Sequence, residues 1–378
     1  MSKKGLLVNT VFSRLFLKTG GLGLLLLVGF ARGELPSPDH PDPASRILAG
    51  IELTIINRFQ QADSVFQGLI RDFPDRPWGY FYRGANLQAW MVDHEDYSRM
   101  EAFHFWMERC IAIVDSLERI KQATAWDYFY QGSAYLYRSF LEGKQRHWWP
   151  AYRHSRQGVK RLEKALELDS TLFDAYLGIG SYKFWKSKKA GILTRLPILK
   201  DETAVGIALV RRALEKGRFV TWIGRDQLAW ILMENGQLQE ALAIARENFE
   251  RFPQSRFFGW TLARVYEKTG HLAEARQLYQ WLLEQIRRLP ENNHYNEVIL
   301  LIKLAELACK RGEEAKGALY LKQIGSIALS PEVKKRLQKR LSRLKDKEAP
   351  CGAWYQTRGA PPGGLRRFLE REFRMLQG

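Results

Sequence analysis

The sequence predicts an all-α protein made of about seven consecutive helical hairpins. One observation is a period of 34 residues over 222–290, and a second is a period of 48 residues over 77–220. Fixed periods of about 20 to 50 residues are typical of repeat architectures. The third observation is the composition, because 12 Trp, 15 Tyr and 20 Phe supply a large apolar core and exclude intrinsic disorder as the main state.

The 34-residue period describes a helix, a turn and a second helix. Gly236 matches Gly270, and the pairs around these glycines also match: Leu228-Ala229 with Leu262-Ala263, and Glu240-Ala241 with Glu274-Ala275. Apolar residues on both sides of Gly236 recur every three or four positions, which indicates one apolar stripe on each of two helices. Gly236 lies where the chain must turn, and Pro253 ends the second helix.

The 48-residue period has the same design with a longer unit. The pattern Trp78-x-Tyr-Phe-Tyr-x-Gly84 returns as Trp126-x-Tyr-Phe-Tyr-x-Gly132, and the glycine returns again as Gly180. Each of these units has about fourteen more residues than a 34-residue repeat. We expect longer helices plus a loop, and all three insertions at the same edge, because insertions at one repeat position lie on one face.

Small residues at the contact between paired helices, such as Gly84, Gly132 and Gly180, resemble those of tetratricopeptide repeat proteins. So does the proline after the second helix. The resemblance covers roughly three quarters of the chain and implies a right-handed superhelical solenoid. The units that it implies are 43–76, 77–123, 125–171, 173–220, 222–255, 256–290 and 297–330.

The two ends of the chain differ from this solenoid. Residues 1–33 contain five basic residues, no acid and the apolar run 21–30, as in a secretory signal peptide. An uncleaved membrane anchor is the alternative, although the run is shorter than the roughly 20 residues that span a bilayer. We expect a proline-rich spacer over 34–43, the solenoid over 44–330, a basic capping helix over 331–349, and a flexible tail over 350–378 with a short basic amphipathic end.

The resemblance also implies a concave groove lined by fixed positions of each first helix. The residues assigned to it are Trp78, Phe81, Trp126, Phe129, Tyr137, Phe184, Trp185, Trp230, Trp260, Arg264 and Lys268. In this interpretation the aromatic rings enclose apolar side chains of a bound segment, and Lys183, Lys186, Arg264 and Lys268 receive its carboxylates. The competing interpretation is that aromatic residues at helical spacing are core.

No residue pattern indicates catalysis or a cofactor. The sequence has no Ser/His/Asp order, no H-E-x-x-H motif and no phosphate-binding glycine loop. Asp93-His94-Glu95-Asp96 offers four metal-capable side chains, but consecutive residues cannot all converge on one ion. A solvated turn that caps the following helix is the favoured interpretation of these four residues. We therefore expect a protein that is not an enzyme and that holds no metal and no cofactor.

The charge balance is strongly basic, with 59 Lys+Arg against 41 Asp+Glu. Basic residues gather over 144–164 and 183–200, around two of the insertions. A basic surface attracts acidic proteins, anionic lipid headgroups, cell-wall polymers or nucleic acid. Nucleic acid is the least favoured partner for an exported protein, and a charge run can also be only a solvated face.

These observations favour an exported scaffold, periplasmic or associated with the cell envelope. It would bind an extended peptide or protein segment, acidic in character, in the concave groove. The alternative is a carbohydrate or cell-wall binding module, because aromatic faces stack on sugars as readily as on peptides.

Overall fold

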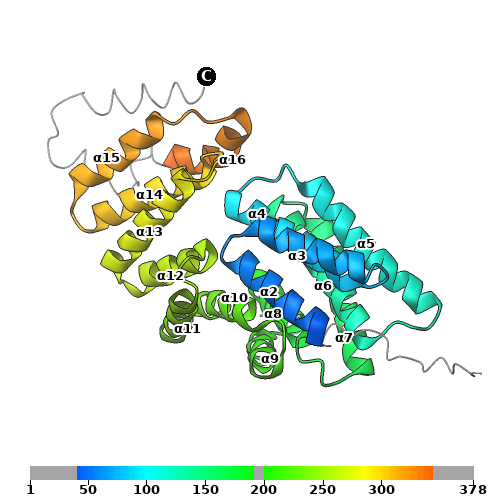
Figure 1. Cartoon of the computed structure of the whole chain (residues 1–378). Helices are drawn as coiled ribbons and strands as arrows, with labels where there is room; N and C mark the ends of the chain where they lie inside the picture. Colours follow the sequence, from blue (N-terminus) through cyan, green and yellow to red (C-terminus); the bar gives the residue numbers. More distant parts are fainter. Residues whose placement is uncertain (1–40, 191–199, 344–378) are drawn as a thin grey trace, which may run out of the picture. The chain divides into compact units, whose positions relative to one another are not determined.

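The computed structural model describes residues 41–190 and 200–343, and within these ranges every regular element is an α-helix. The helices are shown in Figure 1. The predicted signal peptide and the predicted tail lie outside the described residues. The described helices are α2 Pro41–Ile55, α3 Phe59–Asp72, α4 Pro77–His94, α5 Met100–Arg119, α6 Ala125–Lys144, α7 Trp148–Leu168, α8 Ala175–Ala190, α9 Thr203–Lys216, α10 Thr221–Glu234, α11 Leu238–Arg251, α12 Arg256–Thr269, α13 Leu272–Arg287, α14 Tyr295–Lys310, α15 Glu314–Gly325 and α16 Pro331–Arg343.

Consecutive helices pack as hairpins, from α2 with α3 to α14 with α15. The first helix of each hairpin begins within two residues of the predicted unit, so the predicted hairpin architecture is confirmed. The first helix starts at Pro41, inside the predicted proline-rich spacer. Proline is tolerated there because the first backbone N–H groups of a helix have no intrahelical partner.

The lengthened units are mostly helix. In the unit of α4 and α5 only residues 95–99 separate the two helices, and in the unit of α6 and α7 only residues 145–147 do so. The extra residues therefore lengthen the hairpins by whole helical turns. The corresponding part of the α8–α9 unit includes residues 191–199, which lie outside the described residues.

Glycines let the helices of two long hairpins approach closely. A Cβ added at Gly132 of α6 would lie 2.8 Å from the backbone oxygen of Gly158 of α7. In the next hairpin, a Cβ added at Gly180 of α8 would lie 2.6 Å from the backbone oxygen of Gly206 of α9. Both distances are shorter than real Cβ contacts, so the glycines are required for this packing. The 48-residue period matches Gly132 with Gly180.

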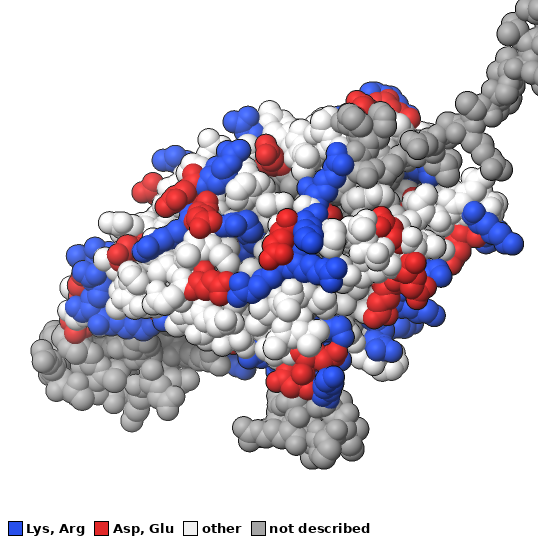
Figure 2. Space-filling view, turned by 90° about the horizontal axis from the view of Figure 1, so that it is seen from below, with Lys and Arg blue, Asp and Glu red and all other residues white. Residues whose placement is uncertain are grey.

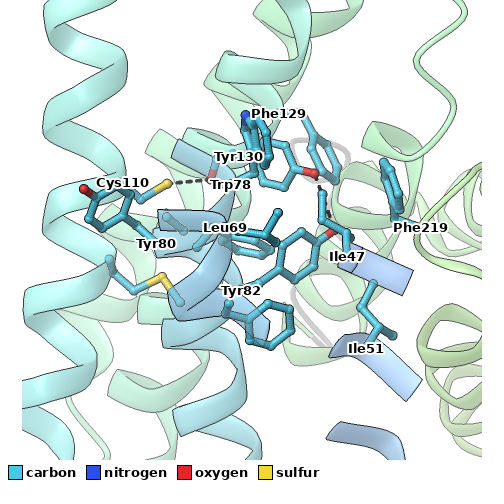
Figure 3. Close-up of a cluster of buried hydrophobic side chains, with 14 of the residues drawn as sticks. Ile47, Ile51, Leu69, Trp78, Tyr80, Tyr82, Cys110, Phe129, Tyr130 and Phe219 are labelled. Atoms are coloured by element: carbon cyan, nitrogen blue, oxygen red, sulfur yellow. Dashed lines mark hydrogen bonds between the residues drawn. The ribbon is translucent and has the colours of Figure 1, made fainter. Parts of the chain in front are cut away.

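The largest core cluster is built mainly from the first three hairpins, and part of it is drawn in Figure 3. Trp78 and Tyr82 of α4 lie in it beside Phe129 and Tyr130 of α6, and the hydroxyl of Tyr130 donates to that of Tyr82 at 3.5 Å. Ile47 of α2 joins the same cluster. Because these helices come from three consecutive hairpins, the cluster binds neighbouring repeats to one another.

The end of α4 contacts helices from the last hairpins of the chain. Asp93 is buried, and its carboxylate oxygens accept hydrogen bonds from Arg256 Nε of α12 at 3.0 and 3.1 Å. Its backbone oxygen accepts a hydrogen bond from Asn296 Nδ2 of α14 at 2.8 Å. Asn57 joins the contact because its Oδ1 accepts a hydrogen bond from the Arg256 backbone N–H at 2.9 Å.

Glu95 forms a second contact at the same end of α4. Its φ of 49° lies in the left-handed region, which is uncommon for residues other than glycine. Its backbone oxygen accepts hydrogen bonds from Asn293 Nδ2 at 3.0 Å and from Arg336 Nη1 of α16 at 2.6 Å, while Lys144 Nζ donates to its carboxylate at 2.7 Å. These contacts hold a backbone conformation that is otherwise costly.

The predicted solvated turn at residues 93–96 is therefore wrong for Asp93 and Glu95. Asp96 lies in the turn, where its carboxylate accepts a hydrogen bond from the Ser98 backbone N–H at 2.8 Å, but no side chain caps α5 at its N-cap residue Arg99, so the predicted capping is also wrong. The partners of Asp93 and Glu95 come from hairpins far along the chain, which a local pattern does not reveal.

Helix α16 begins at Pro331, where the predicted capping helix begins, and residues 344–349 of that prediction lie outside the described residues. Val333, Leu337 and Leu341 of α16 are buried in the same cluster as residues of α13 and α14. Among the described residues, none of the helices is both long enough and apolar enough to cross a membrane.

Candidate functional site

The nine aromatic residues predicted to line the groove fall into three packing clusters. Trp78, Phe81, Trp126, Phe129 and Tyr137 lie in or against the cluster of the first three hairpins. Phe184, Trp185 and Trp230 lie in or against a second cluster, built around α8 to α12, and Trp260 packs against a third, around α12 to α16. The structure therefore distributes the predicted aromatic residues over three separate clusters.

Four of these residues are buried: Trp78, Phe81, Phe129 and Phe184, at 1%, 4%, 5% and 0% exposure. Phe81 packs between Tyr130 and Tyr137, with ring centroids 5.4 and 5.2 Å away. Burial also raises the pKa of Tyr137 to about 12. For these side chains the structure supports core packing, the competing interpretation of the aromatic pattern.

Helix α2 and the connection between α9 and α10 cover the predicted groove positions on α4 and α6. Ile47 and Ile51 of α2 belong to the same buried cluster. Phe219, from the connection between α9 and α10, packs on Trp126 with ring centroids 5.4 Å apart. The chain's own side chains therefore occupy the space that a ligand would need in this part of the groove.

Five other predicted groove residues, on α8, α10 and α12, are partly or fully exposed, and together with Asp226 of α10 they define a candidate surface. We call it the Asp226 surface and define it by Trp185, Asp226, Trp230, Trp260, Arg264 and Lys268. Trp230 Nε1 donates a hydrogen bond to Thr261 Oγ1 of α12 at 2.9 Å. This bond fixes the indole ring between two neighbouring first helices, and Asp226 lies one helical turn before Trp230.

Asp226 is an ionisable group that the fold leaves unsatisfied. Its Oδ1 atom is buried and has no hydrogen-bond partner among the described residues, although the residue as a whole is partly exposed. Burial raises the pKa of Asp226 to about 7, and Thr261 only partly offsets this. A buried carboxyl oxygen without a donor is costly, so a donor supplied from outside the chain would be favourable here. Sequence reasoning missed Asp226 because its type and spacing are ordinary.

The α12 end of the Asp226 surface is positively charged. Glu267 accepts hydrogen bonds from Tyr279 Oη at 2.9 Å and Lys303 Nζ at 3.1 Å, and it pairs with Arg264 at 3.7 Å and Lys310 at 3.8 Å. Burial opposes ionisation of Glu267, but Lys303 holds its pKa below the usual value. Three cations surround this one carboxylate, and exposed Lys268 adds a fourth positive charge.

Lys183 and Lys186 do not face a free site in the structure. Both ammonium groups pair with the carboxylate of Glu202, just before α9. Hydrogen bonds from these two lysines lower the pKa of Glu202. On the face shown in Figure 2, Lys and Arg side chains similarly lie next to Asp and Glu side chains. Many of the positive charges on that face therefore have a carboxylate close by.

The chain is similar to several solved structures. They include the type IV pilus biogenesis factor PilW, with 18% identity, 67% of this chain and 96% of that chain covered, and a TM-score of 0.40. They also include the APC/C hetero-tetramer Cut9-Hcn1, with 13% identity, 86% of this chain and 54% of that chain covered, and a TM-score of 0.49.

A third is the C-terminal part of a TPR repeat-containing protein from Cytophaga hutchinsonii, with 16% identity, 77% and 99% coverage, and a TM-score of 0.38. No protein-family model matches the chain, and no curated protein sequence matches it. The resemblance to tetratricopeptide repeat proteins rests on the chain's own consecutive helical hairpins.

Proposed function

We propose that the protein is a non-catalytic scaffold that binds an extended peptide or protein segment on the Asp226 surface. The observation that carries the proposal is the buried Asp226 Oδ1, which lacks a hydrogen-bond partner among the described residues and lies one helical turn before the partly exposed Trp230. A bound segment would supply the missing donor, a backbone N–H or a basic side chain, after rotation of the carboxyl group brings this oxygen to the exposed part of the residue. The tryptophans would contact its apolar side chains.

The charges on the Asp226 surface would fix the direction in which the segment binds. A donor group of the segment would lie at Asp226, and its acidic groups would lie toward Arg264 and Lys268 on α12. Arg264 is tied to Glu267 in the structure, whereas Lys268 is exposed and forms no ion pair among the described residues. The carbohydrate alternative is less favoured, because stacking on a sugar uses an open aromatic face and these tryptophans are partly buried.

We also propose that the protein is exported to the cell envelope. The support for this is the acid-free, basic and apolar sequence of residues 1–33. N-terminal sequencing of the protein from fractionated cells should give a chain that starts near Glu34. An intact N-terminus in the cytosolic fraction would contradict export.

Selection of peptides from a random phage-displayed library tests the scaffold proposal. The full chain should enrich peptides that carry a basic residue followed by acidic residues, and the Asp226→Asn variant should not enrich the same peptides. Glu284→Gln is the matched control, since Glu284 of α13 is exposed. No enrichment by the wild-type chain, or equal enrichment by Asp226→Asn, would count against the proposed surface.

A further inference from the structure

Helix α7 carries a row of exposed aromatic and basic side chains that we call the α7 stripe. Trp148, Trp149 and Tyr152 are 62%, 71% and 52% exposed, which is unusual for such large apolar groups. Arg153, Arg156 and Lys160 follow them and are also exposed. The spacing of three and four residues places all six on one side of the helix.

The fold holds this stripe in place. The opposite side of α7 is buried through His154, Gly158, Leu162 and Ala165, and the close contact with Gly132 of α6 fixes the helix. The rings of Trp149 and Tyr152 stack on each other, with centroids 5.8 Å apart and planes 29° apart. The aromatic residues are therefore ordered before any partner arrives, which lowers the entropic cost of binding.

The charge along the stripe has one sign. No Asp or Glu occurs from residue 143 to residue 162. The basic residues that point toward neighbouring helices are paired, Lys144 with Glu95 and Arg161 with Glu118. In the part of the chain that the structure describes, Arg153, Arg156 and Lys160 form no ion pair. The exposed charges of the stripe are therefore available to an anionic partner.

We propose that the α7 stripe binds the surface of an anionic lipid bilayer. Tryptophan and tyrosine combine an apolar ring with a polar group and are enriched at the level of the lipid headgroups. Lysine and arginine beside them are attracted to anionic headgroups within a Debye length of the surface. A straight row of such residues along one helix matches a flat surface. This proposal concerns a different face from the Asp226 surface and does not depend on it.

Quenching of tryptophan fluorescence by brominated lipids tests the proposal in the full chain. Residues 1–40 contain no tryptophan, so insertion of the N-terminal segment would not itself be detected. Vesicles of brominated phosphatidylglycerol should quench part of the emission, and vesicles of brominated phosphatidylcholine should not. Replacing two of the 12 tryptophans, by Trp148→Phe with Trp149→Phe, should keep binding but remove most of the quenched emission.

Charge variants give the second arm of the test. Arg153→Glu with Lys160→Glu should reduce partitioning at least about tenfold at low salt, because each basic residue near the surface contributes about fivefold. Lys335→Glu with Lys339→Glu, on the exposed side of α16, is the matched control and should leave partitioning unchanged. Unquenched wild-type emission would overturn the proposal and favour an acidic protein as the partner. Equal quenching by the neutral lipid, or quenching that persists in the Phe variant, would also overturn it.

Discussion

Asp93 and Arg256 form a buried ion pair between α4 and α12, although they are 163 residues apart in the chain. Two hydrogen bonds from Arg256 Nε reach the Asp93 carboxylate, and the Arg256 backbone is itself held by Asn57. The pair therefore joins the second hairpin to the sixth. A buried ion pair of this kind is costly to break, because removing one partner leaves an uncompensated charge.

Arg256→Met should lower the free energy of unfolding by about 3–5 kcal/mol, since it leaves the Asp93 carboxylate buried without its cation. Arg71→Met is the matched control, because the exposed Arg71 pairs with Asp72 on the surface and such surface pairs contribute about 0–1 kcal/mol. Urea unfolding followed by circular dichroism measures both. Similar losses in the two variants would show that the Asp93 contact does not stabilise the fold.

Gly132→Ala should cost about 1–3 kcal/mol, because the new methyl group would meet the backbone oxygen of Gly158 and force α6 away from α7. Gly143→Ala, in the same helix, has open space around it and should leave stability unchanged or raise it by up to about 1 kcal/mol. Thermal melting distinguishes them. A Gly132→Ala variant as stable as Gly143→Ala would contradict the close glycine contact.

Phe184 and Trp185 are neighbours in the sequence with different predicted roles. Phe184 is fully buried, so Phe184→Ala should cost about 3–5 kcal/mol of stability. Trp185 is partly exposed, so Trp185→Ala should cost less stability and should weaken binding of the selected peptides. Melting curves and peptide titrations, made on both variants, separate packing from binding. A loss of stability at Trp185 as large as that at Phe184, with binding retained, would make Trp185 a core residue.

The raised pKa of Asp226 makes stability depend on pH. The folded protein binds a proton at this group up to about pH 7, whereas the unfolded chain releases it near the ordinary Asp value of about 3.9. Asp226 should therefore lower the stability of the fold as pH rises between these two values. Urea unfolding near pH 5 and pH 8 should show this loss in the wild-type chain relative to Asp226→Asn. The same pH dependence in both proteins would show that the Asp226 carboxyl is solvated and that its pKa is not raised.

The sequence predicts the hairpins well because their signals are local. Gly236 and Gly270 both have a φ of 82° at the predicted turns, and the recurring glycines lie at the helix contacts. The candidate site was harder to predict. Whether Trp126 faces a ligand depends on Phe219, and whether residues 93–96 are solvated depends on Arg256 and Arg336. Contacts between residues so far apart in the chain leave no mark on a single sequence.

The pH dependence of peptide affinity tests the central claim, that the Asp226 carboxylate binds a donor of the ligand. A ligand that binds the ionised carboxylate must displace the proton held up to about pH 7. Affinity of a selected peptide for the wild-type chain should therefore rise from about pH 5 to about pH 8, by up to about tenfold per pH unit below the pKa. Asp226→Asn should bind weakly with a flat profile, and Glu284→Gln should follow the wild type. Parallel profiles for the wild type and Asp226→Asn would contradict the claim.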